Sequence, residues 1–256
     1  MTITEALVSG AVQGFTEFLP VSSSGHLVLM RSLLGLPETG VLFDIWLHVA
    51  TLAAVVFYFA KDIAALVREK NTKWLFCIII ATIPAVVAAL FFSEEILKVR
   101  SSVRAVAFML LVTAFMLFAG QVVLWMRKRG GSSPAFTSSF IVGIAQAFAL
   151  IPGISRSGAT ISAGLASGMD AKIAFKFSFL MAIPAIIGAT VYETLKLGSE
   201  SALAGNFAAY ASGMLCAFAA GLVSLRFLWR VMSGKKLFVF GIYCFLVGTG
   251  VILLGK

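Results

Sequence analysis

Four stretches of the chain run for about twenty residues without a charged side chain: residues 74–92, 105–126, 207–225 and 237–255. A helix of that length crosses the roughly 30 Å hydrocarbon core of a bilayer. Of the 256 residues, 60% are hydrophobic and 12% are charged, about half the charged share of a soluble domain. Because lipid offers no water to the backbone, these stretches predict an all-α polytopic membrane protein, with residues 1–256 forming a single integral membrane domain.

The basic side chains are distributed unequally between alternate loops. A formal net charge of +9 would suggest nucleic acid as a partner of a soluble protein, but here the basic residues lie in short loops, so no nucleic-acid partner is expected. One set of loops contains Lys61, Arg68, Lys70, Lys73, Arg127, Lys128, Arg129, Arg226, Arg230, Lys235 and Lys236, whereas the loops between them contain Lys98, Arg100, Arg104 and Lys196. The positive-inside rule places the first set, with a linker at 127–137, in the cytoplasm.

Two further hydrophobic regions contain helix breakers and ionisable side chains. Residues 3–34 are interrupted at Pro20, and residues 140–168 are interrupted at Pro152 and Gly153. Each region divides into two pieces of roughly ten to fourteen residues, which are too short to span a bilayer and fit re-entrant hairpins. Irregular backbone at membrane depth is stable where protein buries it or where it lines a cavity. We therefore expect both regions to be cavity walls.

The two broken regions also resemble each other. A shift of 133 residues aligns Gln13 with Gln146, Phe15 with Phe148, Ser22 with Ser155, Ser24 with Ser157 and Gly25 with Gly158, and it lays residues 41–60 on 174–193. Together with the loop charges, this alignment predicts two inverted-topology repeats, at approximately residues 1–126 and 138–256. Each repeat would be a re-entrant broken-helix hairpin followed by transmembrane helices, giving about six full spans and two re-entrant hairpins.

Opposite charges lie in the two breaker regions. Glu17 precedes the first break, in "TEFLPVSSSGH", and Arg156 follows the second, in "PGISRSGAT". An intramembrane carboxylate is unfavourable without a partner, so a functional or ion-pairing role is expected for Glu17, which is also the candidate metal ligand. Symmetry-related hairpins would bring Glu17 and Arg156 into one cavity. Arg156 then either pairs with Glu17 to hold the hairpins together or binds phosphate oxygens through its planar fork.

The serines after each break carry two interpretations. "SSSG" and "SRSG" both precede a new helix, where one serine per motif is explained as an N-cap. A helix N-terminus flanked by serine and glycine is also an anion site, and two facing each other would suit a diphosphate. The candidate phosphate-binding residues are Ser22, Ser24, Gly25, Ser155, Ser157 and Gly158. His26 lies one turn after Ser23, and it is either a hydrogen-bonded core residue or a proton-transfer group.

Other polar and small residues are interpreted as support. Asp44, His48 and Thr51 recur at i, i+4 and i+7, so they form one polar stripe that either lines the cavity or pairs internally. Gly213, Ala217 and Gly221 are spaced four residues apart and permit close helix contact, either within one chain or in a homodimer.

The two motifs, "GFTEFLPVSSSGH" and "PGISRSGATIS", resemble the signatures of the undecaprenyl-diphosphate phosphatases of the bacitracin-resistance protein type. The resemblance covers essentially the whole chain. It implies a bacterial inner-membrane enzyme with an interdigitated inverted-repeat fold and an active site open to the periplasm. Such an enzyme releases the terminal phosphate of a polyprenyl diphosphate lipid, recycles the cell-wall lipid carrier and confers bacitracin resistance. By motif, the implied catalytic residues are Glu17, Ser23, His26 and Arg156.

The resemblance also implies a divalent cation, Mg²⁺ or Ca²⁺, and here the sequence departs from the family's pattern. The first motif often begins with a glutamate four residues before the second one, and this position is Gln13. Glutamine supplies no charge to a metal. The second carboxylate would be Asp44, or the substrate diphosphate would carry most of the coordination, as Mg²⁺ often prefers. Gln13 and Gln146 are kept as supporting residues beside Asp44 and His48.

Two mechanisms and one different function stay open at this point. Ser23 would attack the terminal phosphorus while Glu17 or His26 takes its proton, or one of these two groups would activate water directly. Inverted repeats with broken helices at the midplane are also typical of transporters, so a transporter or lipid flippase for a phosphorylated substrate is the alternative.

Overall fold

A computed structural model of the chain describes residues 1–35, 41–126, 131–197 and 207–254. In these ranges the regular structure is helical, apart from an isolated bridge between Ser132 and Met169. The helices are α1 (Ile3–Phe18), α2 (Ser23–Leu34), α3 (Val41–Tyr58), α4 (Ala60–Arg68), α5 (Thr72–Phe91), α6 (Ser93–Arg100), α7 (Val103–Met126), α8 (Phe136–Phe148), α9 (Arg156–Ala166), α10 (Ala171–Leu197), α11 (Phe207–Ser233) and α12 (Phe238–Leu254). The predicted all-α membrane architecture is therefore confirmed.

Several helices have the length and hydrophobicity of membrane spans. Among the described residues, 4 helices qualify by themselves, namely α5, α7, α10 and α11. The pair α3 and α4 qualifies as a fifth span, broken by a bend of 64°. At 17 residues, α12 is shorter, and about 26 Å of helix still approaches the thickness of the hydrocarbon core. The chain is a multi-pass membrane protein.

Residues 61–68, treated above as part of a loop, are helical. Helix α4 carries Lys61, Asp62 and Arg68 on exposed or half-exposed positions, while Leu66 is buried. This amphipathic pattern explains why the segment folds as a helix after the bend and not as an open loop. Part of the expected linker, residues 127–130, lies outside the described residues.

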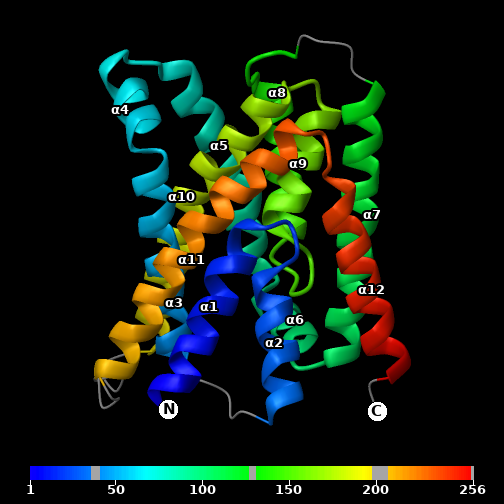
Figure 1. The fold of residues 1–256 in the computed structure, drawn as a ribbon. Coiled ribbons are helices and arrows are strands. Elements are labelled where there is room, and N and C mark those ends of the chain that lie inside the picture. The colour runs from blue at the N-terminus through cyan, green and yellow to red at the C-terminus, as the bar shows by residue number, and fades with distance from the viewer. Residues whose placement is uncertain (36–40, 127–130, 198–206, 255–256) are drawn as a thin grey trace.

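The two broken regions form helical hairpins that enter from opposite ends of the molecule (Figure 1). Helices α1 and α2 share the end where the N-terminus lies, and α8 and α9 share the other end. The two turns meet near mid-height, so the irregular backbone of both hairpins is brought together inside the bundle. This arrangement places the polar breaker residues at the same depth.

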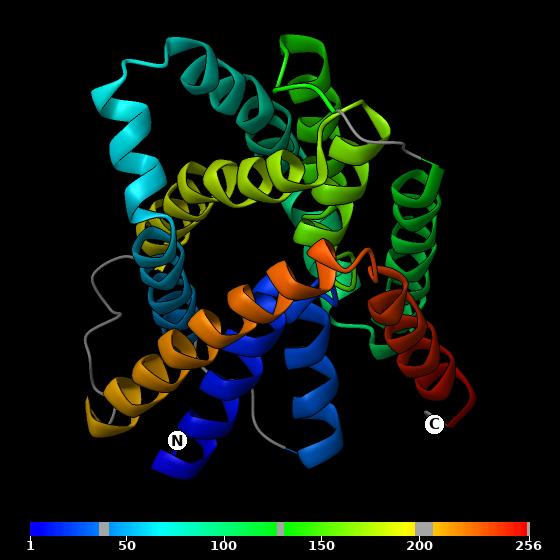
Figure 2. The ribbon, with the colours of Figure 1, turned by 45° about the horizontal axis from the view of Figure 1, so that its top comes forward.

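Each hairpin packs its first helix on a distant helix. Helix α1 lies along α11, as Figure 2 also shows, and α8 lies along α5. Both contacts use small residues, because a Cβ added to Gly14 would lie 2.7 Å from the Cβ of Ala220, and one added to Gly143 would lie 2.7 Å from the carbonyl oxygen of Ala81. The backbones approach too closely for larger side chains.

The small-residue stripe on α11 is used within the chain. A Cβ added to Gly213 would lie 3.0 Å from the carbonyl oxygen of Ala6 on α1, and one added to Gly221 would lie 2.8 Å from the ring of Phe18. Of the two interpretations of this stripe, close helix contact within one chain is confirmed, and the homodimer stays a prediction. The aromatic rings of Phe18, Phe59, Phe175 and Phe179 pack against one another at the centre of the largest hydrophobic cluster.

Candidate active site

The first break is built by Leu19, Pro20 and Val21, which separate α1 from α2. Ser22 then holds a left-handed backbone conformation (φ 71°), which is unfavourable for a residue with a Cβ. Its Oγ accepts a hydrogen bond from the Gly25 backbone N–H at 3.3 Å, so Ser22 is the N-cap of α2. Such strain persists where surrounding contacts hold it in place, and it is frequent at functional sites.

The second break has the same design. Ser155 is the N-cap of α9, and its Oγ accepts from the Gly158 N–H at 3.2 Å. Thr113 of α7 supports the turn from outside, since its hydroxyl donates to the Gly153 carbonyl at 2.8 Å and accepts from the Ser155 N–H at 2.9 Å. The prediction of one capping serine per motif is confirmed at both breaks.

The two breaks contact each other directly. The Gly153 N–H donates to Ser22 Oγ at 3.2 Å. Gly153 has φ 98°, and a Cβ added to Gly25 would lie 3.2 Å from the Gly153 Cα, so glycine is required for this approach. The caps of α2 and α9 are thereby fixed relative to each other, with the two helix N-termini at one place.

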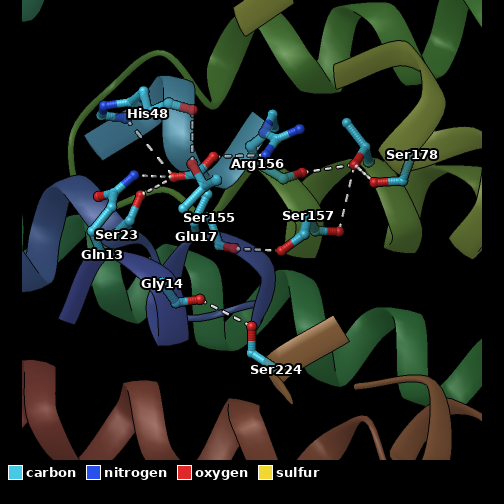
Figure 3. A network of polar contacts seen from close by, with 12 residues as sticks. Gln13, Gly14, Glu17, Ser23, His48, Ser155, Arg156, Ser157, Ser178 and Ser224 are labelled. Carbon is cyan, nitrogen blue, oxygen red and sulfur yellow. Dashed lines mark hydrogen bonds and ion pairs between the residues drawn. The ribbon is translucent and has the colours of Figure 1, made fainter. Parts of the chain in front are cut away.

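Glu17 is the centre of the polar network between the hairpins (Figure 3). Its side chain is buried, and Oε1 accepts from Arg156 Nη2 at 2.7 Å. The other oxygen, Oε2, accepts from Ser23 Oγ at 2.6 Å. The expected meeting of Glu17 and Arg156 is confirmed by this ion pair, which joins α1 to α9 across 139 residues of sequence.

Two supporting residues complete the surroundings of Glu17 Oε2. Gln13 Nε2 donates to this oxygen at 3.1 Å, and His48 Nε2 lies 3.9 Å from it. His48 Nδ1 is 2.8 Å from the Asp44 backbone carbonyl, which holds the ring toward Glu17. Thus α1, α2, α3 and α9 each contribute a side chain.

Two buried atoms in this network have no hydrogen-bond partner in the described part of the chain. They are Gln13 Oε1 and Arg156 Nη1. One is an acceptor and the other is a charged donor, and both belong to side chains bound to Glu17. Buried polar atoms are rarely left unsatisfied, so Gln13 Oε1 is a candidate contact for a cation and Arg156 Nη1 is a candidate contact for an anion.

Asp44 is not in the Glu17 network. Its carboxylate oxygens bind Arg31 Nη2 at 2.5 Å and Arg100 Nη2 at 2.8 Å. A carboxylate shared by two guanidinium groups is a poor additional metal ligand, because displacing those groups would leave buried charge behind. Asp44 has a different role in the structure, since its carbonyl orients His48 and its side chain ties α2 and α6 to α3.

His26 also lies apart from Glu17. Its Nδ1 is 2.9 Å from the Ser22 carbonyl oxygen, and its Nε2 is 2.8 Å from the Tyr243 hydroxyl on α12. The two rings stack at 5.5 Å between centroids. Sequence spacing suggested that His26 would sit beside Ser23 and Glu17. Instead His48, assigned to support, is the histidine that faces the carboxylate.

The candidate phosphate-binding residues differ in exposure. Ser22, Gly25, Ser155, Ser157 and Gly158 are buried, whereas Ser23 and Ser24 are half-buried. The Oγ atoms of Ser22 and Ser155 are engaged in capping, so they shape the two helix N-termini. Gln146 is buried on α8, and neither atom of its amide group has a partner among the described residues.

A metal site made by protein ligands alone does not fit. Within residues 1–35, 41–126, 131–197 and 207–254, no group of three or more His, Cys, Asp or Glu side chains could hold an ion. The donors near one point are the Glu17 carboxylate, the unpartnered Gln13 Oε1 and His48. This set fits a hard cation such as Mg²⁺ that takes one or two protein oxygens and completes its shell with water and phosphate.

Three contributors to the site were missed from sequence. Thr113 braces the second break, Arg100 binds Asp44, and Tyr243 binds His26. Thr113 and Tyr243 are among the few polar side chains in their apolar spans, a signal that could have marked them as facing the interior. Arg100 gave no such signal, since a basic residue near a helix end is ordinary.

The fold and the site define a class of protein: a multi-pass helical membrane protein with a buried carboxylate–guanidinium pair between two broken hairpins. The chain belongs to the family described as bacitracin resistance protein BacA, whose model matches residues 6–250.

Curated relatives of the same length support this family. The undecaprenyl-diphosphatase of Christiangramia forsetii is 40% identical over 264 residues, covering 99% of this chain and 98% of the relative. The undecaprenyl-diphosphatase of Syntrophotalea carbinolica is 38% identical and covers 97% of both chains. That of Halothermothrix orenii is 36% identical, covering 99% of this chain and 98% of the relative.

Proposed function

We propose that this protein is an undecaprenyl-diphosphate phosphatase, which removes the terminal phosphate of the lipid and releases inorganic phosphate. The observation that carries the proposal is a hydroxyl nucleophile beside a base and an anion-binding cation, with Ser23 Oγ 2.6 Å from Glu17 Oε2 and Arg156 bound to the same carboxylate. The relatives named above are undecaprenyl-diphosphatases. The product is a lipid carrier of cell-wall synthesis, and bacitracin resistance follows from depleting the diphosphate form.

Binding of the diphosphate is assigned to Arg156 and the two facing helix N-termini. Arg156 Nη1 is buried and has no partner in the described residues, although Nη2 is held by Glu17. The N–H groups of the first turns of α2 and α9 add partial positive charge at the same place. Stabilising charge on the transferred phosphoryl group is the main catalytic demand in this chemistry.

The chemical step follows from the hydrogen bond between Ser23 and Glu17. Ser23 Oγ attacks the terminal phosphorus and its proton passes to Glu17, while the bond to the bridging oxygen breaks and undecaprenyl phosphate leaves with both electrons of that bond. Water then cleaves the phosphoserine, which restores the hydroxyl and releases phosphate. Direct attack by a water molecule that Glu17 activates is the alternative for the same site. In either case Glu17 takes the proton.

A divalent cation, Mg²⁺ or Ca²⁺, is proposed to arrive with the substrate. Glu17 and Gln13 Oε1 would supply protein oxygens, and the ion would neutralise charge on the diphosphate. The support is the unpartnered Gln13 Oε1 next to Glu17. Gln13 thereby leaves the protein with a neutral ligand where a glutamate would add charge.

The two halves are proposed to be inverted repeats, with α1, α2, α3, α5 and α7 corresponding in order to α8 through α12. Two matched pairs of contacts support this correspondence: α1 packs on α11 as α8 packs on α5, and α3 packs on α11 as α10 packs on α5. The opposite directions of the hairpins support it too (Figure 1). The six spans would then be the bent pair of α3 and α4, counted as one, and the single helices α5, α7, α10, α11 and α12.

Orientation in a bacterial inner membrane is proposed from the basic residues. The turns after α4 and after α11 lie toward one end of the molecule, and α6 lies toward the other (Figure 1). The first end is rich in lysine and arginine and is assigned to the cytoplasm. The first hairpin therefore opens to the periplasm, which is the side from which the diphosphate would reach the site.

The test separates the phosphatase from a transporter or flippase. Purified protein in detergent, where no two compartments exist, should release phosphate from undecaprenyl diphosphate when Mg²⁺ or Ca²⁺ is present. Protein reconstituted in vesicles would be compared for movement of labelled lipid between leaflets. Lipid movement without phosphate release from the detergent sample would contradict the phosphatase and favour the transporter.

A further inference from the structure

Tyr243 on α12 is hydrogen-bonded to His26. The first hairpin itself provides a partner for Nδ1 of the ring, and Tyr243 provides the partner for Nε2. The Ser22 carbonyl oxygen lies 2.9 Å from Nδ1, and the Tyr243 hydroxyl lies 2.8 Å from Nε2. A carbonyl oxygen can only accept a hydrogen bond, so Nδ1 carries a hydrogen. In the neutral ring Nε2 is then an acceptor, and the hydroxyl of Tyr243 donates to it.

The same contact suits the protonated ring. A phenol both donates and accepts, so Tyr243 can turn its O–H away and accept from Nε2–H without movement of heavy atoms. The rings are nearly parallel, with 13° between their planes, which further fixes the orientation of the imidazole. His26 can therefore gain and lose a proton at Nε2 while its position stays constant.

Helix α12 is anchored to the first break at two adjacent residues. Tyr243 binds His26, and Cys244 Sγ lies 3.7 Å from the Pro20 carbonyl oxygen. Cys244 is fully buried, whereas Tyr243 is 43% exposed. Cys244 therefore packs α12 against the first break, and the hydroxyl of Tyr243 adds a polar contact to His26 that the packing does not require.

We propose that Tyr243 is a positioning residue for His26: its hydroxyl holds the imidazole ring through Nε2 and serves that nitrogen in both protonation states, while the Ser22 carbonyl oxygen fixes the hydrogen at Nδ1. The assignment rests on the proposed phosphatase function and adds to it a role for His26, which is proton exchange at Nε2. Glu17 remains the group that takes the proton of the nucleophile. Tyr243 touches neither Glu17 nor Ser23 through any contact among the described residues, so it acts through His26.

The tautomer can be measured without any activity. The chain has 2 histidines, so ¹⁵N-histidine spectra of the full protein in detergent show two rings, and a His26→Asn sample assigns them. The wild type should show His26 in the Nδ1–H form. Tyr243→Phe keeps the ring and removes the hydroxyl, so His26 should stay in the Nδ1–H form while its Nε2 resonance shifts, because that nitrogen has lost its hydrogen-bond donor. An unchanged His26 signal in Tyr243→Phe would overturn the proposal.

Steady-state kinetics of phosphate release give a second test of the role of Tyr243. Tyr243→Phe should lower kcat for phosphate release about five- to tenfold with little change in KM, which is the range of one neutral hydrogen bond. The same substitution in a His26→Ala background should have no further effect, measured with radiolabelled substrate over hours. Tyr210→Phe, whose ring packs on Phe43, is the matched control and should keep wild-type activity.

These experiments distinguish failure of the Tyr243 proposal from failure of the proposed phosphatase function. An equal loss from Tyr243→Phe with and without His26 would show that the tyrosine does not act through the histidine and would overturn the proposal. If the wild type releases no phosphate, the phosphatase assignment fails, and the spectra still decide whether Tyr243 is hydrogen-bonded to His26 Nε2.

Discussion

At the scale of single residues, the proposed chemistry depends on one buried carboxylate. A charged side chain at the centre of a bilayer costs about 3 kcal/mol when it is unpaired. Glu17 avoids that cost through Arg156, Ser23 and Gln13. Each partner also has a proposed use in phosphoryl transfer: Arg156 would bind the anion, Ser23 would be the nucleophile, and Gln13 would offer an oxygen to a cation.

Ser23 is expected to be the nucleophile. Ser23→Ala should lower phosphate release at least about a hundredfold, because the attacking hydroxyl is lost. Rapid quenching with labelled substrate should trap a phosphorylated wild-type protein and none in the variant. Ser9→Ala, which removes another buried hydroxyl from the same hairpin, is the control and should keep activity. A Ser23→Ala enzyme with most of its turnover would instead favour direct attack by water.

Gln13 is expected to give a lower affinity for the divalent cation than a glutamate at this position would. Gln13→Glu places a second carboxylate beside Glu17, and it should lower the Mg²⁺ concentration for half-maximal activity about tenfold. Gln13→Met has a similar volume and no oxygen, so it should raise that concentration. Titrating Mg²⁺ into protein stripped with a chelator measures both. Identical titrations for all three proteins would exclude Gln13 from the cation site.

Much of the site is predictable from sequence because the breakers bring it together. In an apolar bundle, polar residues beside the breaks at Pro20 and Gly153 are stable only where they contact one another. The pairing of Glu17 with Arg156 therefore follows from the motifs. The capping by Ser22 and Ser155 follows from them as well. The two histidines are not predictable in this way. His26 is on α2 and His48 is on α3. Which of them lies beside Glu17 depends on how each helix is rotated about its axis, and tertiary packing sets that rotation.

At the scale of helices, close backbone contact fixes the hairpins. Helix α1 carries both Gln13 and Glu17, and its glycine face lies against α11. Ser224 of α11 adds a hydrogen bond to the Gly14 carbonyl oxygen at 2.9 Å (Figure 3). The depth and rotation of Glu17 are therefore set by a contact one turn away from it.

A large side chain at Gly14 should separate these helices. Gly14→Leu should destabilise the protein by at least about 1 kcal/mol through overpacking, seen as a lower midpoint of thermal aggregation in detergent. Gly188→Leu on α10 is the control, because a Cβ there meets nothing within 4 Å. Equal midpoints for the two variants would contradict the close α1–α11 contact.

Other element-level features depend on tertiary packing and escape sequence analysis. The charged residues after the bend between α3 and α4 lie on an amphipathic helix, α4. Asp62 of α4 forms an ion pair with Lys176 of α10 at 2.6 Å. Arg100 and Asp44 are 56 residues apart and meet because α6 folds back toward α3. Local patterns of hydrophobicity contain no information on either pairing.

At the scale of the whole molecule, two hairpins that enter from opposite ends produce one asymmetric site. The first hairpin and α3 supply Glu17, Ser23 and His48, and the second supplies Arg156. Under the 133-residue shift, Glu17 aligns with Leu150 and His48 with Met181, so the second half has no acid or imidazole at the matching positions. The proposed symmetry provides the geometry, and the difference between the halves provides the chemistry.

The orientation of the molecule has a direct test. In a protein with Cys77, Cys216 and Cys244 replaced by alanine, Glu69→Cys should lie on the cytoplasmic side and Ser101→Cys on the periplasmic side. A membrane-impermeant maleimide applied to intact bacterial cells should label the second variant and spare the first until the cells are opened. Labelling in the reverse order would invert the proposed topology.

The central claim is that Glu17 and Arg156, joined across the two hairpins, form a phosphatase site. The most direct measurement is phosphate release from undecaprenyl diphosphate by purified wild type, Glu17→Gln and Arg156→Ala, with exposed Glu95→Gln and Arg68→Ala as controls. The wild type and controls should turn over substrate, and each site variant should lose at least about a hundredfold in rate. Wild-type rates in both site variants would contradict the claim.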